Sequence, residues 1–470
     1  MSNLDRFGLT IPQLDSIIAE GLRGGGNWCD LYFEDTAYSN LLLRDGEVSS
    51  GGHHIDYGCG IRVLKGEKTG YAYSESTDLG SLLGAAKAAA AISHASNNAA
   101  PLALHPCGIP AGNFYPMERD WSLAAVSEFV PFLKRIGEAI TTREPRAIKV
   151  MATLSYSISH ILMYNSLGEL SSDTRPLGSL SVSAVFKQGE RIEKQQAGLS
   201  FRQGSEMISD ANLEYLVSKT IDGVDQLFEA RRPKGGKMSV VMGAGASGIL
   251  LHEAMGHAFE ADFNRKGQSV FSDKMGSRIC RKGINIVDDG TLPANRGACN
   301  YDDEGVAGQK TYMVTDGILT SFLHDRISAA WYNVAPTGNG RRESFRYNPI
   351  PRMRATYMES GTDGSLEDLI ASVDKGIYVD QFANGQVKIG EGDFTFFVQS
   401  GSLIENGRLT MPVKDINIIG NGPQALADIQ AVAGDLSVDP GTWTCGKEQS
   451  VPVSCGMPSV LVKNLTVGGE

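Results

Sequence analysis

Apolar and polar positions divide the chain into helical and extended stretches. Helical stretches cover residues 12–24, 78–94, 121–143 and 211–231. Thr77 and Asp78 are candidate caps for the second of them. Alternating stretches predict strands at residues 29–34, 40–44, 58–65 and 70–74, and several more within 147–201. Residues 65–70 supply a hairpin turn, and 101–116 a proline-rich loop.

A change of composition at residues 231–237 predicts a domain boundary. This Arg-Arg-Pro-Lys-Gly-Gly-Lys segment combines charge, proline and glycine, as interdomain linkers do. After it come a strand at 238–242, many short β-like runs, and helices near 365–375 and 422–433. Because strands do not alternate regularly with helices, we expect an α+β fold with mainly antiparallel sheets and flanking helices. The predicted domains are 1–230 and a β-rich 238–470.

Composition and charge describe an ordinary globular protein. The 470 residues are 41% hydrophobic and 21% charged, and the net charge is −11. This acidic balance argues against non-specific nucleic-acid binding, which requires a basic face. The amino-terminal residues do not resemble a secretory signal, and the apolar runs are too short and polar to span a membrane. We therefore expect a cytoplasmic protein that binds neither nucleic acid nor membrane.

Seven scattered cysteines form no disulfide framework. Their number is odd and no C-x-x-C pair occurs, so most are expected to be small buried hydrophobic residues. One of them could still ligate a metal as a thiolate.

The most informative stretch is His252-Glu253-Ala254-Met255-Gly256-His257. It is one residue longer than the H-E-x-x-H zinc motif. At about 100° per residue, histidines four apart lie within about 40° of each other, whereas histidines five apart lie about 140° apart. His252 and His257 could therefore share a metal ion only if the helix is locally deformed, by a π-bulge or a kink. Gly256 is a residue type that permits such a deformation.

A catalytic zinc ion needs a third protein ligand besides two histidines. The residues leave several options open: Glu260 and Asp262 follow the motif, and Cys445 and Cys455 lie near the carboxyl end. The two acids could instead orient the imidazoles. Lys447 would favour the thiolate of Cys445.

A glycine-rich string precedes the motif. Residues 243–248 read G-x-G-x-x-G between a strand and a helix, as in dinucleotide-binding folds. No regular βαβ series follows, so we interpret these glycines as packing residues.

Several long motifs, in order, resemble the TldD/PmbA family of metalloproteases, and its TldD branch in particular. The resemblance covers nearly the whole chain and rests on residues 60–63, 66–70, 252–267, 302–305, 336–344, 419–422, 445–447 and 465–469.

The resemblance implies a zinc site and a dimer. The ligands carried over are His252, His257 and Cys445, with one zinc ion per chain, whereas Cys455 falls where the family has no cysteine and is expected to pack. Family members enclose a cavity that admits unfolded peptides as added β-strands. The partner is a second copy or a zinc-free TldE/PmbA-like subunit, and the amino-terminal domain is expected to help form the dimer and cavity.

The expected activity is hydrolysis of unfolded or extended peptides. Zinc polarises the carbonyl and acidifies water, and Glu253 serves as the general base and acid. The substrate class extends to maturation of a modified ribosomal peptide, which the sequence does not separate from general degradation. The alternative is a non-catalytic, metal-containing assembly or peptide-binding subunit. Residues 338–342 offer two cations that could bind a peptide or brace the cavity.

Overall fold

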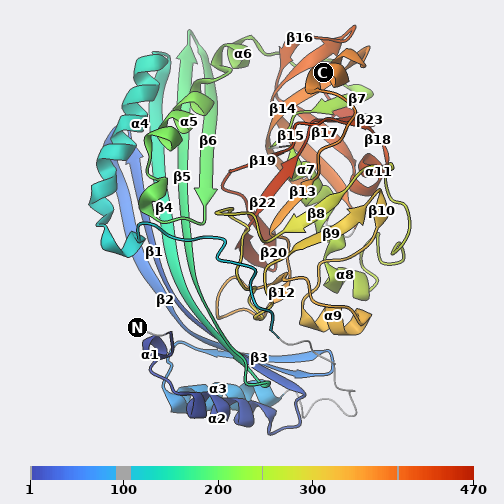
Figure 1. Cartoon of the computed structure of the whole chain (residues 1–470). Helices are drawn as coiled ribbons and strands as arrows, with labels where there is room; N and C mark the ends of the chain where they lie inside the picture. The colour runs from blue at the N-terminus through green and yellow to red at the C-terminus, as the bar shows by residue number, and fades with distance from the viewer. Residues whose placement is uncertain (1–2, 92–106, 246, 389–390, 470) are drawn as a thin grey trace.

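The computed structural model describes residues 3–91, 107–245, 247–388 and 391–469 (Figure 1). Parts of two predicted elements, residues 92–94 of a helix and 101–106 of a loop, lie outside this range. Among the described residues, no helix is both long and apolar enough to cross a membrane. The structure is a mixed α+β fold with several, mainly antiparallel sheets, as predicted.

The amino-terminal half is built on one antiparallel sheet of long strands in the order β3-β2-β1-β4-β5-β6. The hairpin predicted at 65–70 joins β2 and β3. The strands are β1 (Trp28–Arg44), β2 (Glu47–Lys65), β3 (Lys68–Ser74), β4 (Ala147–Asn165), β5 (Leu170–Gln188) and β6 (Arg191–Phe201).

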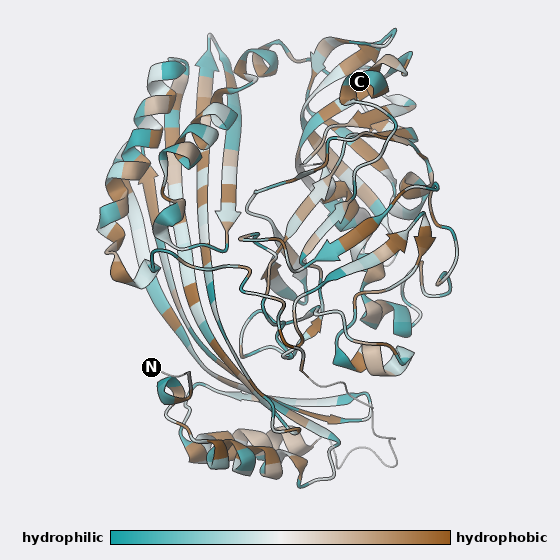
Figure 2. Ribbon diagram, in the orientation of Figure 1, coloured by the Kyte–Doolittle hydropathy of each residue, from teal (hydrophilic) through white to brown (hydrophobic). Residues whose placement is uncertain are grey.

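Helices cover this sheet at its two ends, where they bury separate hydrophobic cores (Figures 1 and 2). One core lies under α2 (Ile11–Leu22) and α3 (Leu79–Ala90). Asp78 caps the amino terminus of α3, where its carboxylate accepts a hydrogen bond from the Ser81 amide. The other lies under α4 (Val130–Arg143) and α5 (Asp210–Ile221). The short helices α1 (Asn3–Phe7) and α6 (Val224–Glu229) lie outside these pairs.

In the carboxyl-terminal half, a β-sheet closes into a barrel. Strands β14, β7, β23, β17 and β15 are hydrogen-bonded in that order, and β14 also pairs with β15. β16 and β18 pair with the barrel strands β15 and β23 from outside the ring. The strands are β7 (Gly236–Met242), β14 (Lys375–Val387), β15 (Asp393–Glu405), β16 (Arg408–Val413), β17 (Ile416–Asn421), β18 (Ile429–Val432) and β23 (Val460–Gly468).

A second sheet has the order β10-β9-β8-β13-β22-β19, and two hairpins, β11–β12 and β20–β21, belong to neither large sheet. Its strands are β8 (Ile286–Asp289), β9 (Lys310–Thr315), β10 (Ile318–Leu319), β13 (Ala355–Met358), β19 (Ser437–Val438) and β22 (Ser454–Met457). The hairpin strands are β11 (Gly340–Arg341), β12 (Ile350–Pro351), β20 (Thr444–Lys447) and β21 (Gln449–Pro452). The helices of this half are α7 (Gly248–Ala254), α8 (Ala261–Arg265), α9 (Arg326–Tyr332), α10 (Leu366–Ala371) and α11 (Gly422–Ala427).

Buried ion pairs join the two halves. The Arg62 guanidinium donates to Asp30 and to Glu304, at 2.6 Å each, with its side chain fully buried. Arg175 donates to Asp303 at 2.5 Å. Removing one partner of a buried ion pair strongly destabilises the folded protein, because the other charge is left buried and unpaired. These contacts therefore fix how the long sheet lies against the barrel half.

Some predicted elements differ from the structure. The two strands predicted at 29–34 and 40–44 are one strand, β1, because its polar middle pairs on both sides with β2 and β4. The helix predicted over 211–231 is interrupted at Gly223, which adopts φ +75. The helix predicted at 422–433 ends at Ala427, and the rest pairs with β23 as β18. The predicted linker also overlaps β7, which begins at Gly236.

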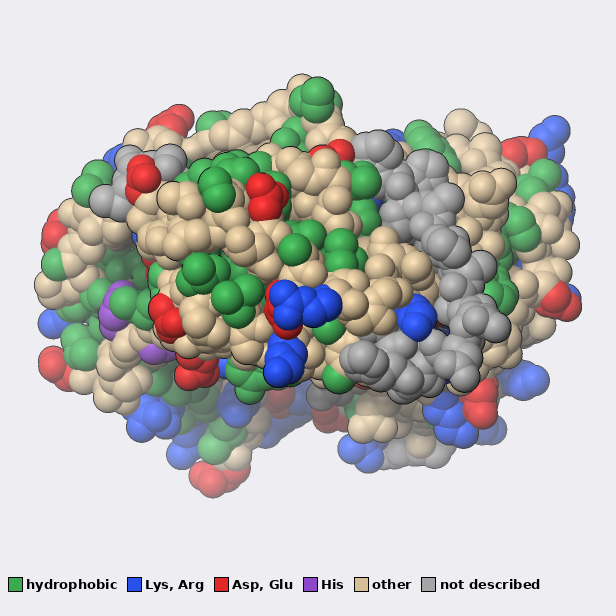
Figure 3. All heavy atoms as spheres, turned by 90° about the horizontal axis from the view of Figure 1, so that it is seen from below, with side chains coloured by type: hydrophobic (Ala, Val, Ile, Leu, Met, Phe, Trp, Pro, Cys, Tyr) green, Lys and Arg blue, Asp and Glu red, His purple; other side chains and the backbone are tan. Residues whose placement is uncertain are grey.

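The face seen from below in Figure 3 carries acidic and basic side chains interspersed with hydrophobic ones.

Candidate metal centre

The turn between β7 and α7 packs closely against the second sheet. A Cβ atom on Gly248 would lie 2.5 Å from the Gly456 backbone nitrogen, so a larger residue would push α7 off β22. Gly245 adopts φ +84, which glycine tolerates readily. This geometry supports the interpretation of the glycine string as packing residues.

The helix that carries His252 breaks before His257, as its spacing predicts. α7 ends at Ala254, Met255 adopts φ −129 and ψ −36, and a 3₁₀ turn covers Gly256–Phe259. Gly256 lies directly after the break, as predicted, and its φ is not in the left-handed region. A Cβ atom there would lie 2.2 Å from the Met353 sulfur, so glycine is needed for close packing.

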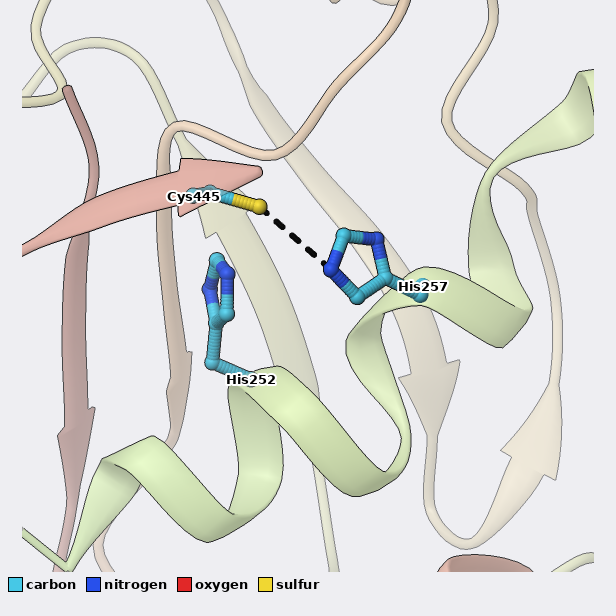
Figure 4. A group of neighbouring side chains, drawn as sticks. All are labelled: His252, His257 and Cys445. Atoms are coloured by element: carbon cyan, nitrogen blue, oxygen red, sulfur yellow. Dashed lines mark hydrogen bonds between the residues drawn. The ribbon is translucent and has the colours of Figure 1, made fainter. Parts of the chain in front are cut away.

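Three potential metal ligands from distant parts of the chain converge at this break. His252, His257 and Cys445 are all buried, and their ligand atoms lie within 4.8 Å of one another (Figure 4). The Cys445 Sγ is 3.3 Å from the His257 Nε2. Two such ligands on one tetrahedral zinc ion would be about 3.5 Å apart. Residue types alone left the third ligand open, the family resemblance implied Cys445, and the geometry brings Cys445 to the two histidines.

Glu260 orients the His257 ring. Its carboxylate lies 2.9 Å from the His257 Nδ1, so that Nε2 faces Cys445. Burial opposes ionisation of Glu260, but Lys447 and His257 lower its pKa to about 2. A carboxylate that holds the second nitrogen of a histidine is the usual support of a metal ligand. Of the two roles open to Glu260, the structure therefore favours orientation over direct ligation.

The donor set fits a zinc ion. Both ring nitrogens of His252 are buried without a hydrogen-bond partner, although buried polar atoms normally have one. Burial opposes a thiolate at Cys445, but the two histidines lower its pKa to about 4. Burial likewise opposes a charged His257, yet Glu260 and Cys445 raise its pKa to about 10. The site thus favours a thiolate next to a positive charge, and a metal ion can supply that charge. Two imidazoles and a thiolate are three ligands of a zinc site that keeps a fourth position open.

Glu253 lies beside this group, at the wall of a cavity. Its Oε2 is 4.0 Å from the His257 Nε2, and its side chain is 27% exposed. The cavity, of about 210 Å³, is lined by both His252 and Glu253. It shares Phe382, Trp443 and Thr444 with a cavity of about 750 Å³ between the amino-terminal sheet and the barrel half. A carboxylate here can reach a water molecule next to the metal ligands.

Comparison with known proteins identifies the family of the chain. The models of the PmbA/TldA metallopeptidase domain 1, central domain and C-terminal domain match residues 29–93, 119–223 and 235–469. The metalloprotease TldD homolog of Haemophilus influenzae is 37% identical over 451 residues, 94% of this chain and 93% of that protein. The chain belongs to the TldD/PmbA metallopeptidase family. A relative from Saccharolobus solfataricus, named a zinc metalloprotease TldD homolog, is 33% identical over 62% of this chain and 65% of its own length. The crystal structure of TldE from Thermococcus kodakarensis shares the fold, with a TM-score of 0.75 and 19% identity over 97% of this chain and all of that one.

In this TldD/PmbA-family chain, Lys447 does not act as predicted. Its Nζ lies 3.0 Å from Glu260 and 2.8 Å from Asp262. It therefore stabilises the acid that orients His257, and the histidines, rather than Lys447, favour the Cys445 thiolate. Asp262, which the sequence left as a candidate ligand, is engaged with Lys447.

Three buried arginines hold the β20–β21 hairpin that carries Cys445. Arg352 donates to the carbonyl oxygens of Cys445 (2.7 Å), Lys447 (3.3 Å) and Gln449 (2.8 Å). Arg296 donates to the Trp443 carbonyl, and Arg341 donates to the Pro452 carbonyl, both at 2.8 Å. Sequence reasoning missed Arg296 and Arg352, because nothing local marks an arginine that binds remote backbone oxygens.

The 338–342 segment also has structural contacts. The Arg342 amide donates to Asp303 at 2.8 Å, and its guanidinium lies 4.2 Å from the centre of the Tyr32 ring. Arg341 holds the β20–β21 hairpin through the Pro452 carbonyl. The sequence left two roles open for this segment, and these contacts favour bracing of the cavity over peptide binding.

Cys455 lies apart from the metal group. It is buried in β22, opposite Thr356 of β13, and burial raises its pKa well above the ordinary value. These are the properties of a packing residue.

Proposed function

We propose that this chain is a zinc-dependent peptidase that hydrolyses unfolded or extended peptides. His252, His257 and Cys445 would hold one zinc ion per chain, and Glu253 would be the general base and acid. The observation that carries the proposal is the convergence of three buried ligand atoms, two of them histidine nitrogens, at a cavity that also exposes a carboxylate.

The residues divide the work of the reaction. When bound, zinc supplies Lewis-acid chemistry, which polarises a carbonyl group and acidifies water. Glu253 accepts the proton of the attacking water and delivers it to the leaving amine. Glu260 keeps the His257 ring in place through the 2.9 Å contact at Nδ1.

An extended peptide fits the surroundings of the site. Within the described residues, β20 pairs only with β21, so the edge of the strand that carries Cys445 is free to accept another strand. Its first residue, Thr444, is exposed and lines both cavities. Backbone pairing along this edge would hold many sequences, which suits degradation of peptides or maturation of a modified ribosomal peptide.

The proposed assembly is a cytoplasmic dimer that encloses the cavity, either of two such chains or of this chain with a zinc-free TldE-like subunit. Light scattering of the purified chain, alone and with such a partner, distinguishes the two.

Three variants test the catalytic proposal. Glu253→Gln should retain one zinc ion per chain and lose hydrolysis of an unfolded, fluorescently labelled peptide by a factor of about 10²–10⁴. Cys445→Ala should lose both zinc and activity. Cys455→Ala is the matched control, since it removes a buried thiol outside the group, and it should keep zinc. Full activity of Glu253→Gln, or a stoichiometric zinc ion in Cys445→Ala, would contradict the assignment. A zinc-loaded wild-type dimer that cleaves no unfolded peptide would instead favour a non-catalytic assembly subunit.

A further inference from the structure

The cavity next to the metal ligands is lined mainly by apolar side chains besides His252, Glu253 and Thr444. Phe382 and Phe396 come from the barrel strands β14 and β15, Ile249 comes from α7, and Trp443 and Val453 flank the β20–β21 hairpin. Phe382, Phe396, Ile249 and Val453 are each at most 8% exposed. The barrel, α7 and the flanks of the β20–β21 hairpin thus direct hydrophobic side chains at one small space.

The larger cavity is lined differently. On the side of the amino-terminal sheet it presents polar side chains, including Thr153, Ser181, Ser183 and Gln196, mixed with apolar ones such as Leu42 and Met151. The smaller cavity is the one that reaches the metal ligand His252 and has a mainly apolar lining.

We propose that the apolar cavity is a specificity pocket, which binds a hydrophobic side chain of the peptide residue adjoining the scissile bond. This inference rests on the proposed function, because His252 and Glu253 mark where the bond would be cut. The substrate class is therefore a peptide with leucine, methionine or phenylalanine at one fixed position relative to the cut.

The volume of the cavity suits such a side chain. It measures about 210 Å³. A water molecule takes about 30 Å³, and an apolar cavity of about 150 Å³ binds benzene. A water at the metal and a phenyl-sized group can therefore occupy it together. One methylene group in a hydrophobic pocket changes specificity by about 10–200-fold. We expect cleavage beside leucine to exceed cleavage beside alanine by at least about tenfold.

The charge of the pocket further restricts its occupant. Glu253 is the acid that lines it, so an aspartate or glutamate of the substrate would meet a like charge. A lysine or arginine could reach Glu253 only by placing its charge among Phe382, Phe396 and Ile249, at a desolvation cost. A neutral apolar side chain meets neither obstacle.

Cut-site profiling tests the pocket. The zinc-loaded wild-type protein is incubated with a synthetic mixture of random-sequence peptides, and the cut sites are identified by mass spectrometry. We expect at least tenfold enrichment of leucine, methionine and phenylalanine at one position. In Phe382→Ala and Trp443→Ala, each of which removes part of the wall, this enrichment should fall several-fold while zinc content stays at one ion per chain.

Phe397→Ala is the matched control. Phe397 follows Phe396 on β15 but is 42% exposed, outside the pocket, so its loss should leave the profile unchanged. A wild-type profile without a preferred side chain, or an equal shift in Phe397→Ala, would overturn the proposal.

A binding measurement separates failure of the pocket from failure of the proposed function. Zinc-loaded Glu253→Gln is titrated with two synthetic peptides that differ only by leucine or alanine at the selected position. If the wild-type protein cuts nothing, positional scanning of leucine along a polyalanine peptide supplies the position. A preference of at least tenfold for leucine supports the pocket even without hydrolysis, whereas equal affinity at every position refutes it.

Discussion

Replacing Glu260 should weaken zinc binding, because its carboxylate orients the ligand His257. The Glu260 carboxylate is fully buried and lies 2.9 Å from the His257 Nδ1. A hydrogen bond to a charged group contributes about 1.5–3 kcal/mol, and a neutral acceptor retains about half of that. Glu260→Gln should therefore cost about 0.8–1.5 kcal/mol at the metal, or about a fourfold to tenfold loss of zinc affinity. Glu260→Ala loses the whole interaction, and the affinity should fall by about 10–100-fold.

The matched control is Asp262→Asn. Both acids contact Lys447, at 3.0 Å for Glu260 and 2.8 Å for Asp262, but only Glu260 contacts His257. Zinc affinity is measured by competition with a chromophoric chelator, and folding stability is measured separately by urea denaturation. Both substitutions remove a buried anion and should lower stability, by up to about 3–5 kcal/mol. Only the Glu260 variants should lose zinc affinity beyond twofold. An equal loss in Asp262→Asn would show that the effect passes through Lys447, and unchanged affinity in Glu260→Ala would refute the orienting role.

Four further substitutions test other parts of the structure. Gly256→Ala should lower stability by about 1–3 kcal/mol, because the new Cβ atom would meet the Met353 sulfur. Gly137→Ala in α4 should raise stability by about 0.5–1 kcal/mol, because nothing lies within 4 Å of its Cβ position. Urea denaturation measures both. Arg352→Lys keeps the charge but cannot bridge three carbonyl groups, so it should cost at least about 1.5 kcal/mol and lower zinc affinity in the chelator competition. Burial raises the pKa of Glu34 from 4.5 to about 7, so the folded state keeps a proton that the unfolded state releases, and stability should fall as pH rises through this window. Glu34→Gln should remove this contribution to the pH dependence and stabilise the protein by up to about 3 kcal/mol at pH 8, as measured by denaturation across pH.

The deformed helix was predictable because it follows from local geometry. Five residues separate His252 from His257, and a regular helix would turn them about 140° apart. The break at Met255 is therefore a requirement of the spacing. Its detailed form was not predictable, since the contact that fixes Gly256 comes from Met353, nearly a hundred residues away.

Strand limits depended on pairing that the sequence does not display. The middle of β1 contains Thr36 and Ser39, which are polar yet buried. The Thr36 hydroxyl donates to Glu34, and the Ser39 Oγ lies 2.9 Å from the His53 Nδ1 across the sheet. Once these partners are in place, the polar stretch continues the strand. Similarly, residues 429–432 form a strand only because β23 offers an edge. Such partners are set by tertiary structure, which overrides local pattern.

The choice between Cys445 and Cys455 shows why the third ligand needed more than residue patterns. Both cysteines are buried in short strands near a glycine, and both lie close to α7 in space. The difference lies in their remote neighbours: the histidines lower the pKa of Cys445 to about 4, whereas burial raises that of Cys455. The hairpin that carries Cys445 is held by Arg296, Arg341 and Arg352 through backbone carbonyl groups, which any sequence provides. Without the family resemblance, the residues around each cysteine therefore do not distinguish the ligand, and the arginines that fix its position are recognisable only once the hairpin is folded.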